Sequence, residues 1–131
     1  MSTEIGASEQ DVIAAQTAAV MQHNMDAFSA GDLDAVVADY DDAALVVNDI
    51  FGTASGRTEI RALFERLLAD VFPPERITVE HTAEIISGRL AFYTWRAENA
   101  SFGTDTFIVE NGRIVLQTFA VQFSHLERNV G

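Results

Sequence analysis

The chain has 131 residues, of which 48% are hydrophobic, and it carries a formal net charge of −12. This length suits one ordinary domain, and the hydrophobic fraction is sufficient for a core together with a pocket or an interface. The chain has no cysteine, and its eight basic residues are all arginines spread along the sequence. This composition excludes thiolate chemistry, disulfides, Schiff-base lysines and the clustered positive charge that nucleic-acid binding requires.

Two helices are expected at the start of the chain. Ser8 is placed to cap the first, with Asp11 as its acidic partner, and apolar residues follow at helical spacing. Gly31 supplies the stop signal of this helix. Asp32 is then placed to cap a short second helix.

A strand and a third helix follow. Residues 43–47 are a short β-prone run, and Gly52 and Gly56 bracket a loop after it. The third helix is expected to begin at residue 57 or 58 and to end at Pro73-Pro74. Its apolar residues recur at helical spacing and predict a buried stripe. They are Ile60, Leu63, Phe64, Leu67, Leu68 and Val71.

The second half of the chain has the pattern of strands, at 76–86, 90–99, 103–110 and 113–123. Asn111-Gly112, between the last two, is a strong hairpin signal. Helices followed by an antiparallel meander indicate an α+β fold rather than alternating α/β units.

We expect one domain spanning residues 8–124, with flexible ends at 1–7 and 125–131. The first ten residues are polar and acidic, unlike a signal peptide. No apolar run approaches the roughly 20 residues that a membrane span needs. These features predict a cytoplasmic protein that binds neither membranes nor nucleic acid.

Both faces of the last strand carry apolar residues. Alternation puts Gln117 and Phe119 on one face, and Ile114, Leu116 and Thr118 on the other. A sheet with a solvated back would alternate more cleanly between apolar and polar residues. We therefore expect a second copy of the chain to cover the outer face, forming a homodimer. The alternative is that the tail of the same chain covers it.

The order of elements and three short motifs resemble the nuclear transport factor 2-like superfamily, in particular its SnoaL-like and ketosteroid isomerase-like members. The motifs are Ala30-Gly31-Asp32-Leu33-Asp34 between two helices, Asp41-Asp42-Ala43 before the first strand, and Gly56 ahead of Ile60-Arg61. The resemblance implies a cone-shaped, curved antiparallel sheet wrapped on three N-terminal helices around one pocket. It also implies a small-molecule ligand and, commonly, dimerisation through the outer face of the sheet.

Asp105 is the first candidate for chemistry. It shares a strand face with Phe107, and desolvation among apolar groups raises the pKa of a carboxyl group. A carboxyl kept protonated near neutrality can donate a hydrogen bond to a developing oxyanion. The segment from Asp105 to the Asn111-Gly112 hairpin is similar to where ketosteroid isomerases keep their oxyanion-hole aspartic acid. The alternative is that Asp105 only forms a hydrogen bond near the start of its strand.

His81 is the second candidate. It is either a core histidine with a satisfied hydrogen bond or a cavity residue that acts as an acid or a base near neutral pH. Its neighbours Glu80 and Glu84 are expected to face away from it. Alternation puts an otherwise apolar set on its face: Ile77, Val79, Ala83 and Ile85.

Asp49 is the third candidate, because ketosteroid isomerases have a general-base aspartate at the end of the equivalent first strand. The spacing from that strand to Gly52 is longer here, and Asn48-Asp49 is equally typical of a turn. The same family has a tyrosine on its first helix, where this chain has Asn24. An amide there can donate a hydrogen bond, but it is a weaker acid than a phenol, so steroid isomerisation itself is not expected.

A second resemblance is to limonene epoxide hydrolases. Asn48 and the Arg96-Ala97-Glu98 segment are similar to two parts of their site, but Phe119 stands near the place of the third, an acid. The resemblance requires Arg96 to point into the pocket. By strand alternation, Tyr93 and Trp95 would then point outward. Because aromatic rings favour the apolar side of a sheet, we expect Tyr93 and Trp95 inside.

The residues therefore predict an aromatic pocket with a few polar groups. Its expected ligand-binding residues are Asn24, Tyr40, Asn48, Phe51, Phe64, Tyr93, Trp95, Gln117 and Phe119. We expect no metal and no cofactor, because no histidine or acid has ligand spacing. The first hypothesis is an isomerase or cyclase that acts on a small hydrophobic carbonyl compound by general acid–base chemistry. The alternatives are a non-catalytic ligand-binding module and a dimeric interaction domain.

Overall fold

The computed structural model describes residues 8–124, and the predicted flexible ends lie outside the described residues. The elements in chain order are α1 (Glu9–Ala30), α2 (Leu33–Ala38), β1 (Tyr40–Asn48), β2 (Gly52–Ser55), α3 (Gly56–Arg66), the π-helical segment η2 (Leu67–Val71), β3 (Glu80–Ser87), β4 (Leu90–Ala97), β5 (Ala100–Glu110) and β6 (Arg113–Phe123). The predicted α+β class is confirmed.

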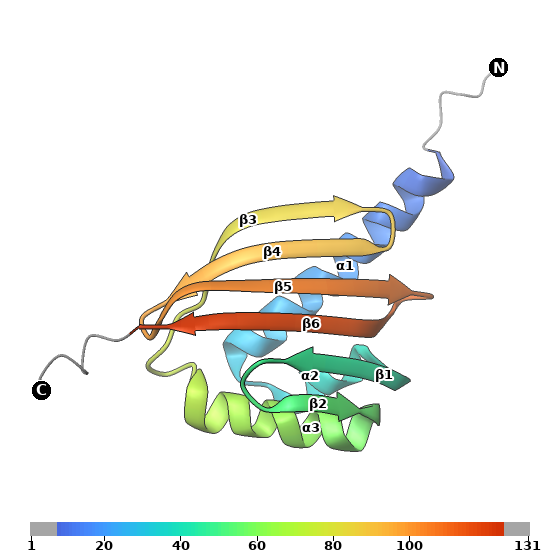
Figure 1. Cartoon of the computed structure of the whole chain (residues 1–131). Helices are drawn as coiled ribbons and strands as arrows, with labels where there is room; N and C mark the ends of the chain where they lie inside the picture. The colour runs from blue at the N-terminus through green and yellow to red at the C-terminus, as the bar shows by residue number, and fades with distance from the viewer. Residues whose placement is uncertain (1–7, 125–131) are drawn as a thin grey trace, which may run out of the picture.

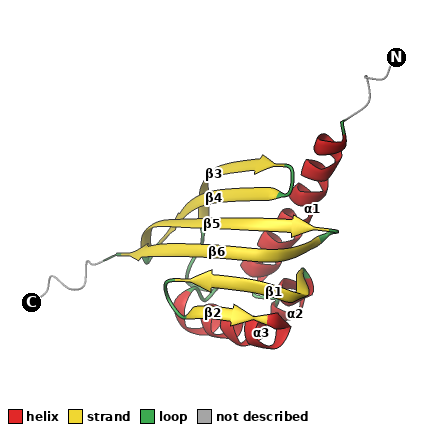
Figure 2. Cartoon of the chain, turned by 45° about the vertical axis from the view of Figure 1, so that its right-hand side comes forward, coloured by secondary structure: helices red, strands yellow, loops and turns green. Residues whose placement is uncertain are grey.

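The six strands form one curved, unclosed sheet in the order β2-β1-β6-β5-β4-β3 (Figure 1). All neighbouring strands are antiparallel except β1 and β6, which run parallel. The helices lie on one face of this sheet (Figures 1 and 2). Helix α1 contacts β3, β4 and β5, whereas α3 contacts β1 and β2. The inner face is therefore covered by helices, and none of the helices within residues 8–124 lies on the outer face.

The predicted helix ends are confirmed. The Ser8 side chain accepts a hydrogen bond from the backbone of Asp11, and the Asp11 side chain accepts one from the backbone of Ser8. Gly31 ends α1 in the left-handed conformation, at φ 70°, which a residue without a side chain adopts most easily. Asp32 caps α2 by accepting from the backbone N–H of Ala35 at 3.1 Å.

The loop predicted between Gly52 and Gly56 contains strand β2 instead. The Asn48 side chain accepts hydrogen bonds from the backbone N–H groups of Ile50 and Phe51 and donates to the carbonyl of Gly52. These three bonds close a turn and return the chain alongside β1. Helix α3 accordingly begins at Gly56, immediately after β2.

The predicted strand at 76–86 begins only at Glu80 and contains a bulge. His81 is opposite Trp95, but Ala83 is opposite Thr94, so one extra residue interrupts the alternation. Beyond the bulge the two faces are exchanged. The prediction that Ala83 and Ile85 share the face of His81 is therefore wrong.

The bulge also decides where the later β3 side chains lie. Ile85 is opposite Phe92 on the outer face and is 57% exposed. Glu84 is opposite Tyr93 on the inner face, so the prediction that it faces away from His81 is wrong as well. A second register shift, between β5 and β6, turns Ile114 inward, opposite Val109, instead of outward with its expected neighbours.

The expected inward orientation of Tyr93 and Trp95 is confirmed, since both are buried. The indole of Trp95 lies against the backbone of Gly103, its partner on β5. A Cβ atom added to Gly103 would lie 2.3 Å from two carbons of the indole ring. The absence of a side chain at 103 is therefore what allows the indole to lie flat on the sheet.

Gly103→Ala should lower the free energy of unfolding by roughly 1–3 kcal/mol, the usual cost of overpacking a core. Urea denaturation followed by circular dichroism measures the loss. The control is the same change in a Trp95→Leu background, where the methyl group no longer meets the indole and should cost much less. An equal cost in both backgrounds would contradict the proposed clash.

Candidate functional site

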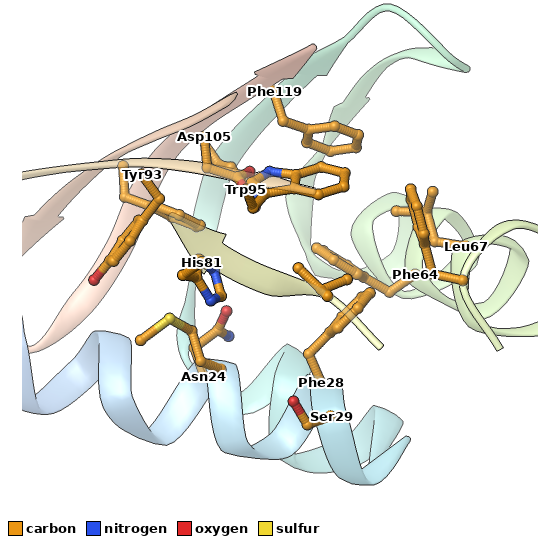
Figure 3. Close-up of a pocket in the computed structure, with 15 residues that line it drawn as sticks. Asn24, Phe28, Ser29, Phe64, Leu67, His81, Tyr93, Trp95, Asp105 and Phe119 are labelled. Carbon is orange, nitrogen blue, oxygen red and sulfur yellow. The ribbon is translucent and has the colours of Figure 1, made fainter. Parts of the chain in front are cut away.

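A cavity of about 80 Å³ lies between α1 and the inner face of the sheet (Figure 3). Two of the three catalytic candidates, Asp105 and His81, line it. So do six of the nine expected ligand-binding residues: Asn24, Phe64, Tyr93, Trp95, Gln117 and Phe119. Residues from α1, α3, β3, β4, β5 and β6 thus meet at one place, although they are far apart in the sequence.

A second hollow, of about 150 Å³, adjoins the cavity and shares four wall residues with it: Phe28, Ser29, Phe72 and Val79. It is bounded on its other side by Pro74, Ile77 and Thr78. The end of α1 and the segment that leads from η2 to β3 therefore flank the approach to the cavity.

Tyr40 and Asn48 do not line the cavity. Tyr40 is fully buried behind Gln117 and donates a hydrogen bond from its Oη atom to the Oε1 atom of that residue. Asn48 uses both ends of its amide to close the turn between β1 and β2. Tyr40 therefore supports the wall from behind, whereas Asn48 shapes the hairpin.

Asp49 and Phe51 also lie away from the cavity. The carboxylate of Asp49 accepts from the backbone N–H of Val121 at 3.2 Å, so the turn directs it along the edge of β6 rather than inward. The ring of Phe51 lies under the guanidinium of Arg66, at 3.8 Å from the ring centroid. The expectation that these two residues face the pocket is corrected by this arrangement.

Several lining residues were missed by the sequence analysis. Phe28 lies one helical turn after Asn24 on α1, and Phe107 lies two positions after Asp105 on β5. Both could have been predicted from their spacing to site residues. Residues four apart on a helix share a face, and so do residues two apart on a strand. Val79 was marked by its alternation with His81, two positions later, whereas Phe72 follows η2 in a segment without regular periodicity, and no comparable signal marks it.

The carboxyl group of Asp105 is held by a chain of two hydrogen bonds. Gln117 donates from Nε2 to Asp105 Oδ1 at 3.1 Å, and Tyr40 donates to Gln117 Oε1. Because Tyr40 Oη occupies the oxygen end of the amide, the nitrogen end must face Asp105. The buried tyrosine thereby fixes the orientation of the group that contacts the acid.

Burial raises the pKa of Asp105 from its ordinary value of 3.8 to about 6, while the hydrogen bond from Gln117 and the nearby indole N–H of Trp95 act to lower it. The pKa of Asp105 is raised, as expected, but it remains below 7. Asp105 is therefore mostly ionised at pH 7 and mostly protonated below pH 6. A ligand that displaced the remaining water would raise the pKa further.

His81 lies at the edge of the cavity, with its ring against Tyr93 at 5.2 Å between centroids. Desolvation lowers the pKa of His81 below 6.5, and the charge of Glu84 partly opposes this effect. The imidazole is consequently neutral at pH 7 and can accept a proton. Asp105 and His81 thus offer an acid whose pKa is raised and a base whose pKa is lowered by the same cavity.

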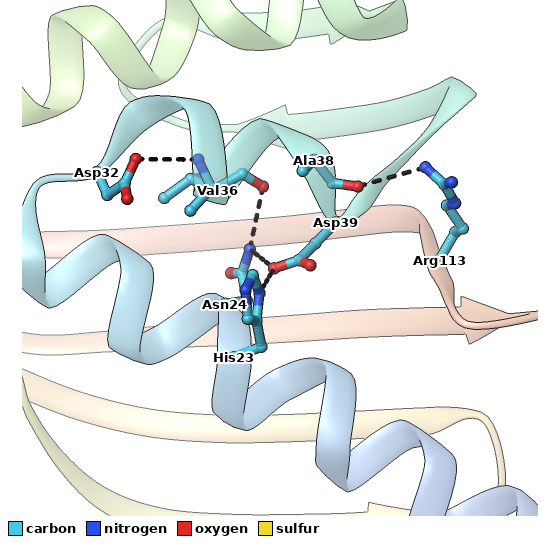
Figure 4. Close-up of polar contacts among 8 residues, drawn as sticks. His23, Asn24, Asp32, Val36, Ala38, Asp39 and Arg113 are labelled. Atoms are coloured by element: carbon cyan, nitrogen blue, oxygen red, sulfur yellow. Dashed lines mark hydrogen bonds and ion pairs between the residues drawn. The ribbon is translucent and has the colours of Figure 1, made fainter.

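Asn24 presents an acceptor to the cavity. Its Nδ2 atom donates to the carbonyl of Val36 at 3.4 Å and to Asp39 at 3.2 Å, and Asp39 also pairs with His23 at 2.8 Å (Figure 4). These contacts turn the amide hydrogens toward α2, and the amide oxygen points toward the cavity (Figure 3). The expectation that Asn24 donates a hydrogen bond to a ligand is therefore wrong.

Two polar atoms of the aromatic wall form no hydrogen bond of ordinary geometry within residues 8–124: the Oη atom of Tyr93, which lies near Glu84, and the Nε1 atom of Trp95, which lies near Asp105. Both side chains are buried, and burying a donor without a partner costs about 1–3 kcal/mol. Such atoms are unusual in a native structure and are typical of a site that binds a ligand or an ordered water molecule.

Within the part of the chain that the structure describes, no group of three or more histidine and acidic side chains is arranged to hold a metal ion. None of the described helices is long and apolar enough to cross a membrane.

The profile of the SnoaL-like domain matches residues 21–117, which is well over half of the sequence. The chain belongs to the SnoaL-like family. This match includes the second half of α1, which carries Asn24, and the strands that carry His81 and Asp105. A search of curated proteins found no match to this SnoaL-like chain.

Solved structures share the fold of this SnoaL-like protein at low sequence identity. A Sinorhizobium meliloti protein assigned as a polyketide cyclase is 18% identical, with a TM-score of 0.67 over 76% of this chain and 92% of that one. An epoxide hydrolase of the limonene type from M. tuberculosis is 17% identical, with a TM-score of 0.65 over 82% and 84%. A Kribbella flavida protein assigned as a ketosteroid isomerase is 13% identical, with a TM-score of 0.70 over 84% and 80%. These likenesses show the nuclear transport factor 2-like fold.

Asp105→Asn should stabilise the protein at about pH 8 but not at about pH 3.5. Between the ordinary pKa of 3.8 and the folded-state pKa of about 6, the folded chain binds more protons than the unfolded chain, so stability falls as the pH rises. Above pH 6 the loss amounts to about 3 kcal/mol at most, which the asparagine variant avoids. Thermal and urea unfolding at the two pH values measure the difference. A variant that is equally stabilised at both values would contradict the raised pKa.

Proposed function

We propose that this SnoaL-like protein is an enzyme of the isomerase or cyclase type that acts on a small hydrophobic carbonyl compound by general acid–base chemistry, without a metal. One observation supports it above the others: the Asp105 carboxyl lines an aromatic cavity, is fixed there by Gln117, and has a pKa of about 6. Perturbed carboxyl groups in a cleft are typical of active sites. Similar structures assigned as a cyclase and an isomerase support the same class.

The reaction requires one proton donor and one proton acceptor. Neutral His81 takes a proton from the carbon beside the substrate carbonyl, and the electrons of that C–H bond move into the C=C bond of an enol. Protonated Asp105 gives a hydrogen bond or a proton to the carbonyl oxygen as negative charge develops there. His81 then returns its proton to carbon, and Asp105 recovers its own. Because Asp49 lies outside the cavity, the proton-transfer role goes to His81.

The second candidate is a non-catalytic ligand-binding module that uses the same cavity. It is favoured by Asn24, which offers an amide oxygen where the isomerase branch has an acidic phenol. The cavity of about 80 Å³ is also smaller than the roughly 300–1,000 Å³ of sites for drug-sized ligands. Both candidates therefore require a compact ligand.

Exchange of carbon-bound hydrogen in heavy water tests the enzyme directly. The protein should speed deuterium incorporation beside the carbonyl of small cyclic ketones such as cyclohexanone, followed by proton NMR. Asp105→Asn should slow the catalysed exchange by on the order of 100-fold, the lower range for loss of a general acid. Because the reaction needs protonated Asp105 and neutral His81, the rate should fall above about pH 6 as Asp105 ionises, and fall again at acidic pH once His81 is protonated.

The matched control for this experiment is Asp49→Asn, which makes the same chemical change outside the cavity and should leave the exchange rate unaltered. Exchange that is as fast in Asp105→Asn as in the unaltered protein would remove Asp105 from the mechanism. If the protein binds the ketones but catalyses no exchange, the binding-module candidate is favoured instead.

We further propose that the protein is a homodimer through the outer face of the sheet. In the middle of the four central strands the outward positions carry no charged side chain, although the chain has a net charge of −12, and the charged Arg96, Glu110 and Arg113 lie near the strand ends. By strand register the uncharged outward positions are Leu45, Val47, Leu90, Phe92, Thr94, Thr104, Thr106, Ile108, Leu116, Thr118 and Ala120. No described helix covers them (Figure 2). An uncharged central patch on an otherwise acidic protein suits contact with a second copy, since repulsion is smallest there.

Val47→Glu should convert the dimer to a monomer, because the partly exposed Val47 lies on β1 in this face. Analytical ultracentrifugation measures the oligomeric state. Ala62→Glu adds the same charge at an exposed position of α3 and should leave the dimer intact. A monomeric unaltered protein would overturn this proposal.

A further inference from the structure

The indole N–H of Trp95 is a rigid donor in the cavity wall. Trp95 is 5% exposed, and its Nε1 atom forms no hydrogen bond of ordinary geometry with a described residue, although the Asp105 carboxyl lies close to it. The backbone of Gly103 lies directly beneath the indole, and Phe72 contacts it edge-on at 5.5 Å between centroids. These contacts oppose rotation of the ring, so the N–H stays fixed in the wall. An indole nitrogen can only donate, so any ligand group that binds it must be an acceptor.

The amide oxygen of Asn24 is an acceptor in a different wall. Asn24 belongs to α1, whereas Trp95 belongs to β4, and the cavity lies between these elements (Figure 3). Asn24 is 6% exposed, and its amide hydrogens are used by Val36 and Asp39. What this side chain offers to the cavity is therefore an oxygen that accepts, and its complement is a hydroxyl or N–H group.

Charge restricts the ligand further. Among the described residues that line the cavity there is no arginine, and the lining includes the carboxyl group of Asp105. An anionic ligand would be repelled by ionised Asp105 and would lose its hydration without gaining a cation. The cavity therefore favours an uncharged molecule, and its volume favours a compact one.

We propose that the natural ligand is a small, uncharged hydroxy ketone, whose carbonyl oxygen accepts from Trp95 Nε1 and whose hydroxyl donates to Asn24 Oδ1. This inference rests on the proposed carbonyl substrate and specifies its class. Trp95 and Asn24 are then substrate-binding residues of opposite hydrogen-bond polarity. A simple ketone satisfies only the indole, and a carboxylate satisfies neither group without electrostatic cost.

The chain contains one tryptophan, so its indole N–H gives one resonance in the proton NMR spectrum. The probes are cyclohexanone, its α-hydroxy derivative adipoin, the methyl ether of adipoin, and cyclohexanecarboxylate. Both ketones should shift the indole resonance, since both place an oxygen against it. Adipoin should bind about fivefold more tightly than cyclohexanone, the affinity expected for one additional hydrogen bond. Its methyl ether should lose this advantage, and the carboxylate should not bind.

Asn24→Leu should lower the affinity for adipoin to that for cyclohexanone without changing the latter. Trp95→Phe keeps an aromatic ring and should lower the affinity for both ketones about fivefold. This affinity is measured by ligand-observed NMR, because the variant has no indole resonance to follow. The comparison of adipoin with its methyl ether uses the unaltered protein, so it stands even if a variant fails to fold.

Equal affinity of the unaltered protein for adipoin, its ether and cyclohexanone would overturn the inference, as would an indole resonance that none of them shifts. The same ketones report separately on catalysis through exchange in heavy water. Selective binding of adipoin without hydrogen exchange would contradict the proposed enzymatic activity but support the hydroxy ketone as ligand. Hydrogen exchange without selective binding would support the enzymatic activity but contradict the hydroxy ketone as ligand.

Discussion

The site depends on one constraint, which is that an ionisable carboxyl must be kept in a cavity walled largely by aromatic rings. Asp105 is held there by an amide whose orientation is set from behind by a fully buried phenol, that of Tyr40. The arrangement costs stability whenever the carboxyl is ionised, because burial raises its pKa. A core of the same volume without the acid would be more stable, so this cost is typical of a site kept for function.

The surrounding walls follow from how the sheet is built. Strand pairing puts Tyr93 opposite Asp105 and Trp95 opposite Gly103, and alternation turns all of them toward α1. The missing side chain at 103 gives the indole room, and the indole in turn brings its N–H close to the acid. The polar groups of the cavity are therefore positioned by strands and by helix α1 rather than by loops, which favours a site with fixed geometry.

Much of this could be predicted from the sequence, because the signals were local. Ser8, Gly31 and Asp32 mark helix ends through backbone chemistry that depends on adjacent residues only. The alternation around Asp105 and Trp95 was likewise sufficient to turn them inward. The orientation of Asn24 was not predictable, since it depends on Asp39 and Val36, which reach it only once α1 and α2 have packed together. Asp49 was misplaced because the side-chain contacts of Asn48 decide the course of the turn.

The bulge in β3 could not be predicted from the sequence either, because an extra residue in one strand is defined only by its register with the partner strand. It has a consequence beyond the exchange of faces. Strand β3 is one of the two borders of the sheet, and a border strand with unpaired backbone groups invites other chains to add to it. The irregularity at 82 interrupts the row of groups on that border and increases its local twist. The bulge that brings Glu84 to the inner face thus also disfavours pairing of this edge with a strand of another chain.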